Sequence, residues 1–271
     1  TQWFTSQERG LAVGVYSTAP SVGWIVALVV ADPLRTFFGD WRWVMVTFAL
    51  ASVLSGLFWI AVGGSNPATE MSPSQNESNS ALWGDPTVRR LLFLAFMIFF
   101  VGHALTGWMP EMLHSGPWST RGAAWLTASG IAVGVVGSLL IPGRVTSHAR
   151  PKVLVAMFGA MAIAVWALVI TPQMVQVIAV AVIGVVRVSS VPMAMLLLMS
   201  APRVSDARMG AAGGLFFTAG ELGGVTGPWL IGIARQNSVD FVPAVAMLSL
   251  VALVSAVACW WFTRSGFFNN A

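Results

Sequence analysis

The sequence contains few charged residues and a single cysteine. Only 9% of its 271 residues are Asp, Glu, Lys or Arg, whereas 56% are hydrophobic; soluble domains carry about 25% charged residues. Cys259 stands alone, which excludes an internal disulfide framework and a multi-cysteine metal site. The motifs H-E-x-x-H, the phosphate-binding P-loop and G-x-S-x-G are also missing. These absences favour a membrane protein that is not an enzyme, and we expect no cofactor and no metal.

The net charge of +4 does not indicate a nucleic-acid partner. The basic residues form no dense patch and mostly flank long apolar runs. Such a distribution is typical of membrane topology rather than of a nucleic-acid-binding face. We therefore expect the partners to be the lipid bilayer and a small-molecule substrate, and no nucleic acid.

Long apolar runs predict eight transmembrane helices. A membrane-spanning helix needs roughly 20 mostly apolar residues. Such runs cover residues 11–31, 44–62, 91–110, 123–141, 153–170, 175–199, 209–231 and 242–262. The first run should end at Asp32 and Pro33, while Asp85 and Pro86 should provide the cap and first turn before the third. The sequence thus predicts an all-α polytopic membrane protein.

A polar stretch divides the chain into two parts. Residues 64–88 are rich in Ser, Asn, Pro and Glu, which is typical of a flexible linker. The predicted division is two helices in 1–63, a cytoplasmic linker in 64–88 and six helices in 89–271. Basic residues are enriched in cytoplasmic loops, so an uneven count favours cytoplasmic termini. With the N-terminus inside, the residues expected in the cytoplasm are Arg9, Arg89, Arg90, Arg144, Arg150, Lys152, Arg203, Arg208 and Arg264. Those expected outside are Arg35, Arg42, Arg121 and Arg235.

The run at 209–231 carries many glycines and one carboxylate, Glu221. Glycines allow helices to approach closely in a membrane. The residues expected to pack in this way are Gly210, Gly214, Gly223, Gly227 and Pro228. The run is echoed near the N-terminus, which predicts two copies of one structural unit. The matching residues are Gly210, Ala212, Gly214, Thr218, Ala219 and Gly223 with Gly10, Ala12, Gly14, Thr18, Ala19 and Gly23.

Three ionisable residues are expected at one depth in the membrane. His103, Arg187 and Glu221 each lie about 12 or 13 residues from the cytoplasmic end of a predicted helix. At 1.5 Å per residue this places them roughly 18 to 20 Å deep, near the middle of a core about 30 Å thick. Ionisable groups at that depth cost about 2.5 kcal/mol or more, so a functional site is the default hypothesis.

Each of these residues has a structural alternative beside its functional interpretation. Arg187 offers several donors to a carboxylate or another oxyanion, but it could instead pair with Glu221 to hold two helices together. Glu221 and His103 are candidates for proton coupling or gating. His103 could equally form a hydrogen bond to a neighbouring helix. Trp108 is a further candidate for substrate binding, although membrane tryptophans more often pack.

Several stretches resemble the major facilitator superfamily. WFTSQERGLAVG and GDWRWV are similar to the entry to that family's fifth helix and to the loop before its sixth. The basic loop with Gly143, Arg144, Arg150 and Lys152 resembles the cytoplasmic gating loop between helices eight and nine. Ser147 and His148 stand there in place of the family's Asp and Arg, which departs from its charged pattern.

The resemblance implies a superfamily-type helical bundle with family helices 5 to 12 present and the first four missing. It also implies a secondary transporter that rocks two halves around a midplane site. We expect a small anionic solute bound by Arg187, His103 and Trp108, with proton-coupled symport through Glu221 and His103. Gly23-Trp24 replaces the family's Gly-Pro antiporter pair, which favours symport or uniport.

Two alternatives remain open from the sequence. One is an exporter of drugs or hydrophobic metabolites in which the midplane charges are structural. The other, of a different class, is a non-transporting membrane scaffold or truncated remnant. The expected location is a bacterial-type inner (plasma) membrane with both termini in the cytoplasm.

Overall fold

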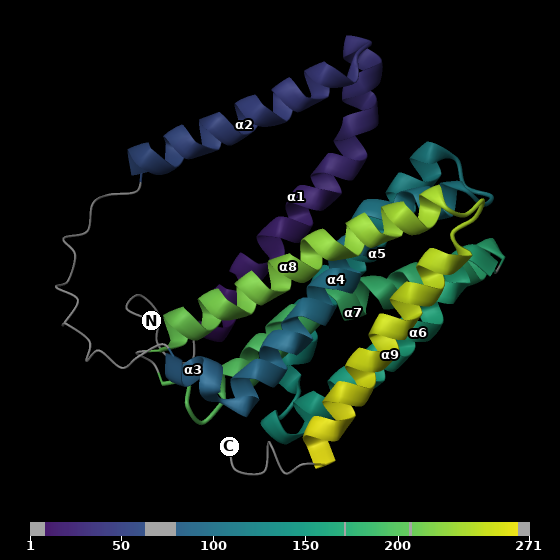
Figure 1. The fold of residues 1–271 in the computed structure, drawn as a ribbon. Coiled ribbons are helices and arrows are strands. Elements are labelled where there is room, and N and C mark those ends of the chain that lie inside the picture. The colour runs from purple at the N-terminus through teal and green to yellow at the C-terminus, as the bar shows by residue number, and fades with distance from the viewer. Residues whose placement is uncertain (1–8, 63–79, 171, 206–207, 265–271) are drawn as a thin grey trace.

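The computed structural model describes residues 9–62, 80–170, 172–205 and 208–264, and these residues fold into helices without any strand (Figure 1). This confirms the predicted all-α class. The helices are α1 (Arg9–Phe38), α2 (Trp41–Val62), α3 (Ser80–Gly84), α4 (Pro86–His114), α5 (Thr120–Arg144), α6 (Arg150–Ile170), α7 (Gln173–Met199), α8 (Met209–Gln236) and α9 (Val242–Arg264), with a short 3₁₀ turn at Ser147–Ala149.

Helices α4 to α9 form one bundle, and α1 and α2 stand at its edge. Within the bundle α8 lies along α4, α5 along α7, and α6 along α9 (Figure 1). Helix α1 packs against α5, while α2 packs on α1 and reaches away from the bundle. Val44 is the buried residue of α2, so most of that apolar helix faces outward. The buried core therefore belongs to the six helices that follow the predicted linker.

Seven helices in the described part of the chain are long and apolar enough to cross a membrane. They are Thr18–Phe38, Trp41–Val62, Pro86–His114, Thr120–Arg144, Ser147–Val169, Gln173–Met199 and Val242–Phe262. The remaining expected span, at 209–231, lies in α8, which has the length but not the apolarity. Its many glycines and Glu221 lower its hydropathy, so its place in the bundle depends on packing against α4.

The start of α4, next to the predicted linker, follows from local capping. The Asp85 carboxylate accepts hydrogen bonds from the backbone N–H groups of Thr87 (2.6 Å) and Val88 (3.4 Å), and Pro86 begins α4 as expected. The other carboxylate oxygen of Asp85 lies 3.5 Å from the guanidinium of Arg203, in the connection between α7 and α8. Helix α3 lies within the range expected for the linker, whose residues 64–79 fall outside the described part.

Helix α1 continues through the residues that were expected to end it. The expected end at Asp32 and Pro33 is wrong, because α1 runs to Phe38. A proline within a helix removes one backbone hydrogen bond and its ring crowds the carbonyl four residues earlier, which can kink a helix without ending it. The hydroxyl of Thr36 donates to the Asp32 carbonyl at 2.9 Å. Termination occurs at Gly39, which has a positive φ of 74° and donates its N–H to the Arg35 carbonyl at 2.9 Å.

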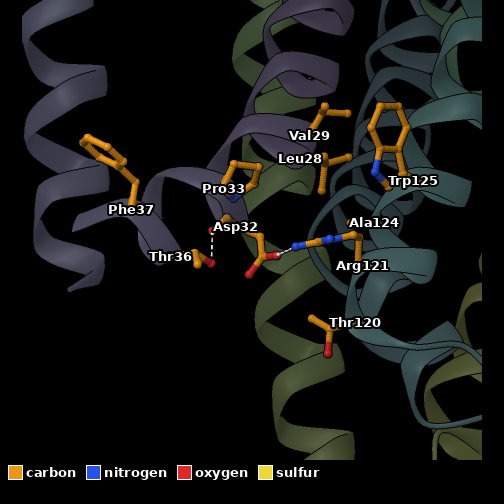
Figure 2. Close-up of a pocket in the computed structure, with 10 residues that line it drawn as sticks. All are labelled: Leu28, Val29, Asp32, Pro33, Thr36, Phe37, Thr120, Arg121, Ala124 and Trp125. Atoms are coloured by element: carbon orange, nitrogen blue, oxygen red, sulfur yellow. Dashed lines mark hydrogen bonds and ion pairs between the residues drawn. The ribbon is translucent and has the colours of Figure 1, made fainter. Parts of the chain in front are cut away.

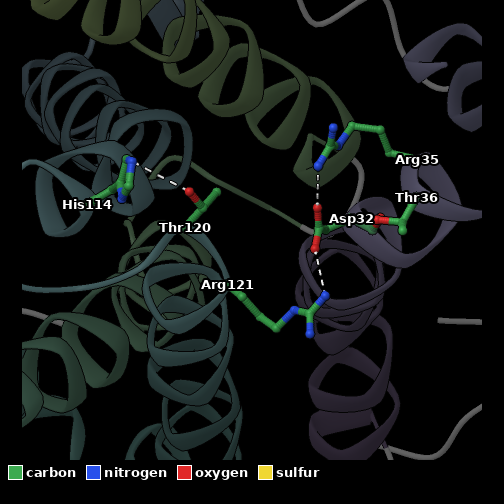
Figure 3. Close-up of polar contacts among 6 residues, drawn as sticks. All are labelled: Asp32, Arg35, Thr36, His114, Thr120 and Arg121. Carbon is green, nitrogen blue, oxygen red and sulfur yellow. Dashed lines mark hydrogen bonds and ion pairs between the residues drawn. The ribbon is translucent and has the colours of Figure 1, made fainter. Parts of the chain in front are cut away.

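A carboxylate on α1 binds two arginines and so joins α1 to α5. Asp32 accepts hydrogen bonds from Arg35 on its own helix, at 3.0 Å, and from Arg121 at the start of α5, at 3.2 Å (Figure 3). Asp32 was expected to end the helix because it is charged, and these two arginines neutralise that charge within the helix. The contact with Arg121 connects residues on the two sides of the predicted linker.

Backbone contact through glycine fixes the pairing of α8 with α4. A Cβ added at Gly223 would strike the carbonyl oxygen of Phe96, and one at Gly227 would strike that of Phe100. Side chains at these two positions would force the helices apart, so the observed spacing requires glycine. By contrast, no atom lies within 4 Å of a Cβ added at Gly210 or at Gly214.

Direct backbone contact at glycines also joins α5 to α7. A Cβ at Gly134 would meet the carbonyl of Gly184, and one at Gly184 would meet the carbonyl of Gly130. Because the glycines of the two helices face each other, the backbones are in direct contact. Both close pairs thus depend on small residues rather than on interlocking large side chains.

We predict that Gly223→Ala destabilises the fold while Gly214→Ala does not. The first change places a methyl group against the Phe96 carbonyl and should cost about 1–3 kcal/mol. The second, on the same helix, meets open space and should stabilise by roughly 0.5–1 kcal/mol through helix propensity. Thermal unfolding in detergent micelles measures both. Equal melting temperatures for the two variants would contradict the packing described here.

Candidate functional site

A cavity of about 280 Å³ opens between α1, α4, α7 and α8. Its polar wall is formed by Ser21, His103, Thr106, Arg187 and Glu221. The remaining lining residues are Pro20, Trp24, Ile98, Phe99, Gly102, Val188, Val191, Pro192 and Phe217. The cavity thus brings together one guanidinium, one imidazole and one carboxylate among mostly apolar neighbours.

Arg187 is held by α4 but is not paired with a carboxylate in the described part of the chain. Its Nη1 donates to the hydroxyl of Thr106, which in turn donates to the Gly102 carbonyl at 2.8 Å. A Cβ added at Gly102 would lie 3.6 Å from the Arg187 Cγ, so the arginine stem passes directly over this glycine. Its Nε is buried and has no hydrogen-bond partner among the described residues. Arg187 therefore retains unused capacity to bind an anion.

His103 and Glu221 form the second polar group of the cavity. The imidazole Nε2 lies 4.0 Å from a carboxylate oxygen of Glu221, and Nδ1 lies 3.1 Å from the Phe99 carbonyl. The ring of Phe99 also stacks on the imidazole, with centroids 5.5 Å apart. The side chains of His103 and Glu221 are 41% and 61% exposed, so both remain open to a ligand or to water.

The structure brings together three of the four residues proposed from the sequence for binding or coupling. His103, Arg187 and Glu221 line one cavity, in keeping with their similar expected depth. The alternative of an ion pair between Arg187 and Glu221 is not realised in the described structure, because Glu221 lies against His103. Trp108 lies elsewhere: its indole N–H donates to the Pro228 carbonyl at 3.1 Å, and its ring packs edge-on against Phe241.

Several lining residues were missed by sequence reasoning. Thr106 is the most important, because its hydroxyl binds Arg187 directly. A signal existed: Phe99, Gly102, His103 and Thr106 recur at helical spacing and so lie on one face of α4. The positions three and four residues from His103 on this face are therefore Thr106 and Phe99.

A second cavity, of about 570 Å³, lies between α1 and α5 (Figure 2). It is lined by Leu28, Val29, Asp32, Pro33, Thr36, Phe37, Thr120, Arg121, Ala124 and Trp125. Its charges already neutralise each other, since Asp32 and Arg121 are bonded across it. This cavity is larger, but none of its described lining residues has a buried donor atom that lacks a hydrogen-bond partner, as the Nε of Arg187 does.

The basic loop after α5 is mostly solvent-facing. Gly143 and Arg144 end α5 and are exposed, as is Lys152 near the start of α6. Arg150 begins α6 and is partly buried, with an Nε that has no partner in the described structure. The described residues contain no cluster of three or more His, Cys, Asp or Glu side chains that could hold a metal ion.

The family model described as Major Facilitator Superfamily matches residues 1–228. The chain belongs to the Major Facilitator Superfamily. No curated protein matches it. The matched range includes α1 to α7 and most of α8, and thus every residue that lines the cavity.

Membership in the Major Facilitator Superfamily makes the chain an integral membrane protein and a secondary transporter. Proteins of this superfamily generally transport solutes rather than catalyse reactions. In transporters built from structural repeats, the substrate site lies near the membrane midplane where the repeats meet. The cavity between α1 and the six-helix bundle is lined by residues from both sides of the predicted linker.

Proposed function

We propose that this protein transports a small anion by alternating access, with Arg187 as the anion anchor. The observation that carries the proposal is the buried Arg187 Nε without a partner, beside a cavity and without a carboxylate in the described structure. Leaving a buried charge uncompensated costs several kcal/mol. A bound anion would compensate it with an opposite charge and short charge-assisted hydrogen bonds, whereas a neutral substrate could accept hydrogen bonds but would leave the charge uncompensated.

We further propose proton-coupled symport through Glu221 and His103. With Nδ1 donating to the Phe99 carbonyl, the Nε2 lone pair of a neutral His103 points to the side where Glu221 lies. Either the imidazole or the carboxylate can then carry the exchangeable proton, since the two groups lie 4.0 Å apart. Its presence removes one negative charge from the cavity that receives the anion, so proton and anion binding would favour each other.

The ion pair between Asp32 and Arg121 fits a gate for alternating access. Asp32 lies eight residues after Trp24, a cavity-lining residue, and thus about 12 Å further along α1. That end of α1 is the one that the count of basic residues assigns to the outside. For the cavity to open there, α1 and α5 would have to separate. Arg144, Arg150 and Lys152, with Gly143, remain the candidates for a gating loop on the cytoplasmic side.

The proposal extends to topology. Both termini and the predicted linker would be cytoplasmic, in a bacterial-type inner membrane. Residues 1–63 would belong to an N-terminal half whose other four helices are supplied by the same protein, and 89–271 would form the C-terminal half. In the exporter alternative, Arg187 and Glu221 form a structural ion pair. In the described structure Glu221 lies against His103 instead, which favours the anion transporter.

We predict that Arg187→Gln abolishes anion uptake by the protein in proteoliposomes. Losing a charged hydrogen bond should weaken binding by about 1.5–3 kcal/mol, or roughly 10- to 150-fold. Arg235→Gln is the matched control, because Arg235 lies at the end of α8 and donates to the Ser238 carbonyl at 2.8 Å. A panel of small anions with neutral analogues provides the substrates. Undiminished uptake by a folded Arg187→Gln protein would refute the anchor role.

Glu221→Gln should uncouple transport from protons. The amide keeps the shape of the side chain but cannot carry the exchangeable proton. We expect uptake driven by an imposed pH gradient to be lost, whereas exchange of labelled for unlabelled anion continues. Both are measured in the same proteoliposomes. A variant that still responds fully to the pH gradient would exclude Glu221 as the coupling group.

Arg121→Gln should make the cavity more accessible from the outside, and Arg35→Gln should not. Both arginines bind the same Asp32 carboxylate, but only Arg121 lies on another helix. An exposed ion pair contributes about 0–1 kcal/mol, so labelling of a Ser21→Cys reporter by a membrane-impermeant thiol reagent should accelerate up to about fivefold. The double exchange Asp32→Arg with Arg121→Asp should restore the slow rate. Similar acceleration by Arg35→Gln would argue against gating.

A further inference from the structure

Resting on the proposed anion site, we infer that the ligand of this cavity is a small organic monocarboxylate with a compact apolar body, such as a ring or a branched chain. The cavity distinguishes this class from inorganic oxyanions and from dicarboxylates. Three features carry the inference: the position of the single guanidinium, the apolar wall, and the carboxylate that faces the same space.

The cationic end of the cavity suits one carboxylate group. Arg187 is the arginine of the lining, and Thr106 holds one of its nitrogens from α4. A planar carboxylate matches the fork of guanidinium donors in a way that a neutral hydroxyl does not. Among the described residues that line the cavity, there is no second arginine or lysine to receive another negative group.

The rest of the wall is apolar and partly aromatic. Phe99 and Phe217 meet edge to face, with ring centroids 6.0 Å apart. The other apolar members of the lining are Trp24, Ile98, Val188 and Val191. A nitrate or phosphate ion would leave this surface uncovered, whereas a hydrocarbon body would remove it from water.

The carboxylate of Glu221 disfavours a second negative charge on the ligand. Its side chain lines the cavity and is 61% exposed, and its ionic neighbour in the described structure is His103, 4.0 Å away. When Glu221 is ionised, a dicarboxylate would place like charges near each other without a cation to separate them. A monocarboxylate bound at Arg187 avoids this repulsion.

The volume limits the size of the apolar body. The cavity measures about 280 Å³, below the range of about 300–1,000 Å³ that is usual for drug-sized ligands. A single ring or a short branched chain fits that space.

The test is equilibrium binding of radiolabelled benzoate to the purified protein in lipid nanodiscs, with unlabelled competitors. We expect benzoate and isovalerate to compete effectively. Formate, nitrate, phosphate and phthalate should be at least about tenfold weaker, and benzyl alcohol, which lacks the charge, should not compete. Arg187→Gln should abolish benzoate binding.

Variants of the apolar wall separate its contribution from that of the charge. Phe217→Ala should weaken benzoate binding about tenfold or more and leave formate binding unchanged, and Phe217→Leu should be intermediate. Trp229→Ala is the control, since Trp229 lies on the same helix, is 64% exposed and does not line the cavity. Thermal unfolding of each variant shows whether it is folded.

The outcomes distinguish this inference from the proposed function. Binding of nitrate, phosphate or phthalate as tight as that of benzoate, and dependent on Arg187, would overturn the monocarboxylate assignment while anion transport stands. Unchanged benzoate binding in a folded Phe217→Ala protein would also overturn it. If no anion of the panel binds, both the inference and the proposed anion transporter are wrong.

Discussion

Direct backbone contact between α4 and α8 determines where the charged side chains of this transporter lie. Gly223 and Gly227 bring α8 against the carbonyls of Phe96 and Phe100. Between them, a Cβ added at Gly224 would lie 3.1 Å from His103 Nδ1 and 3.3 Å from a carboxylate oxygen of Glu221. A side chain at position 224 would therefore crowd both His103 and Glu221.

The energetic consequences differ between the two sides of α4. On the α8 side, close van der Waals packing against α4 stabilises α8, which is less apolar than the other long helices. On the α7 side, Arg187 is brought into the cavity with one neutral partner, Thr106, rather than with a carboxylate. In a structural ion pair, a carboxylate of the protein would always compensate the charge of such an arginine. In the described structure Arg187 lacks the carboxylate partner that a structural ion pair would provide, and this is why we propose that a ligand supplies the opposite charge.

Much of the fold was predictable because a bilayer permits few solutions. Backbone groups in lipid must be bonded internally, so long apolar runs become helices, and they did. The errors fall where tertiary contacts override local signals. Asp32 and Pro33 suggest a helix end, but Arg121 lies 89 positions away in the sequence and stabilises the carboxylate inside the helix. Conversely, glycine content alone could not show that Gly223 meets α4 while Gly214 meets nothing.

For the candidate site, the sequence predicts how far along its helix each residue lies, but not which way its side chain points. Counting residues predicted a shared depth for His103, Arg187 and Glu221, because the rise of a helix is constant. It could not predict their rotation about the helix axes, which decides that Glu221 faces His103 and that Trp108 donates to the Pro228 carbonyl outside the cavity. Rotation is set by which faces pack, and that depends on all neighbouring helices at once.

One turn of α4 connects the two proposed events of transport. Gly102 and Thr106 contact Arg187, while His103, between them in sequence, faces Glu221. A ligand that binds Arg187 and a proton held by His103 and Glu221 thus act on neighbouring residues of a single rigid element. Because binding linkage is reciprocal, any preference of the anion for the protonated cavity equals the preference of the proton for the anion-bound one. Coupling in this transporter then needs no long-range pathway, since both ligands share one cavity and one helix.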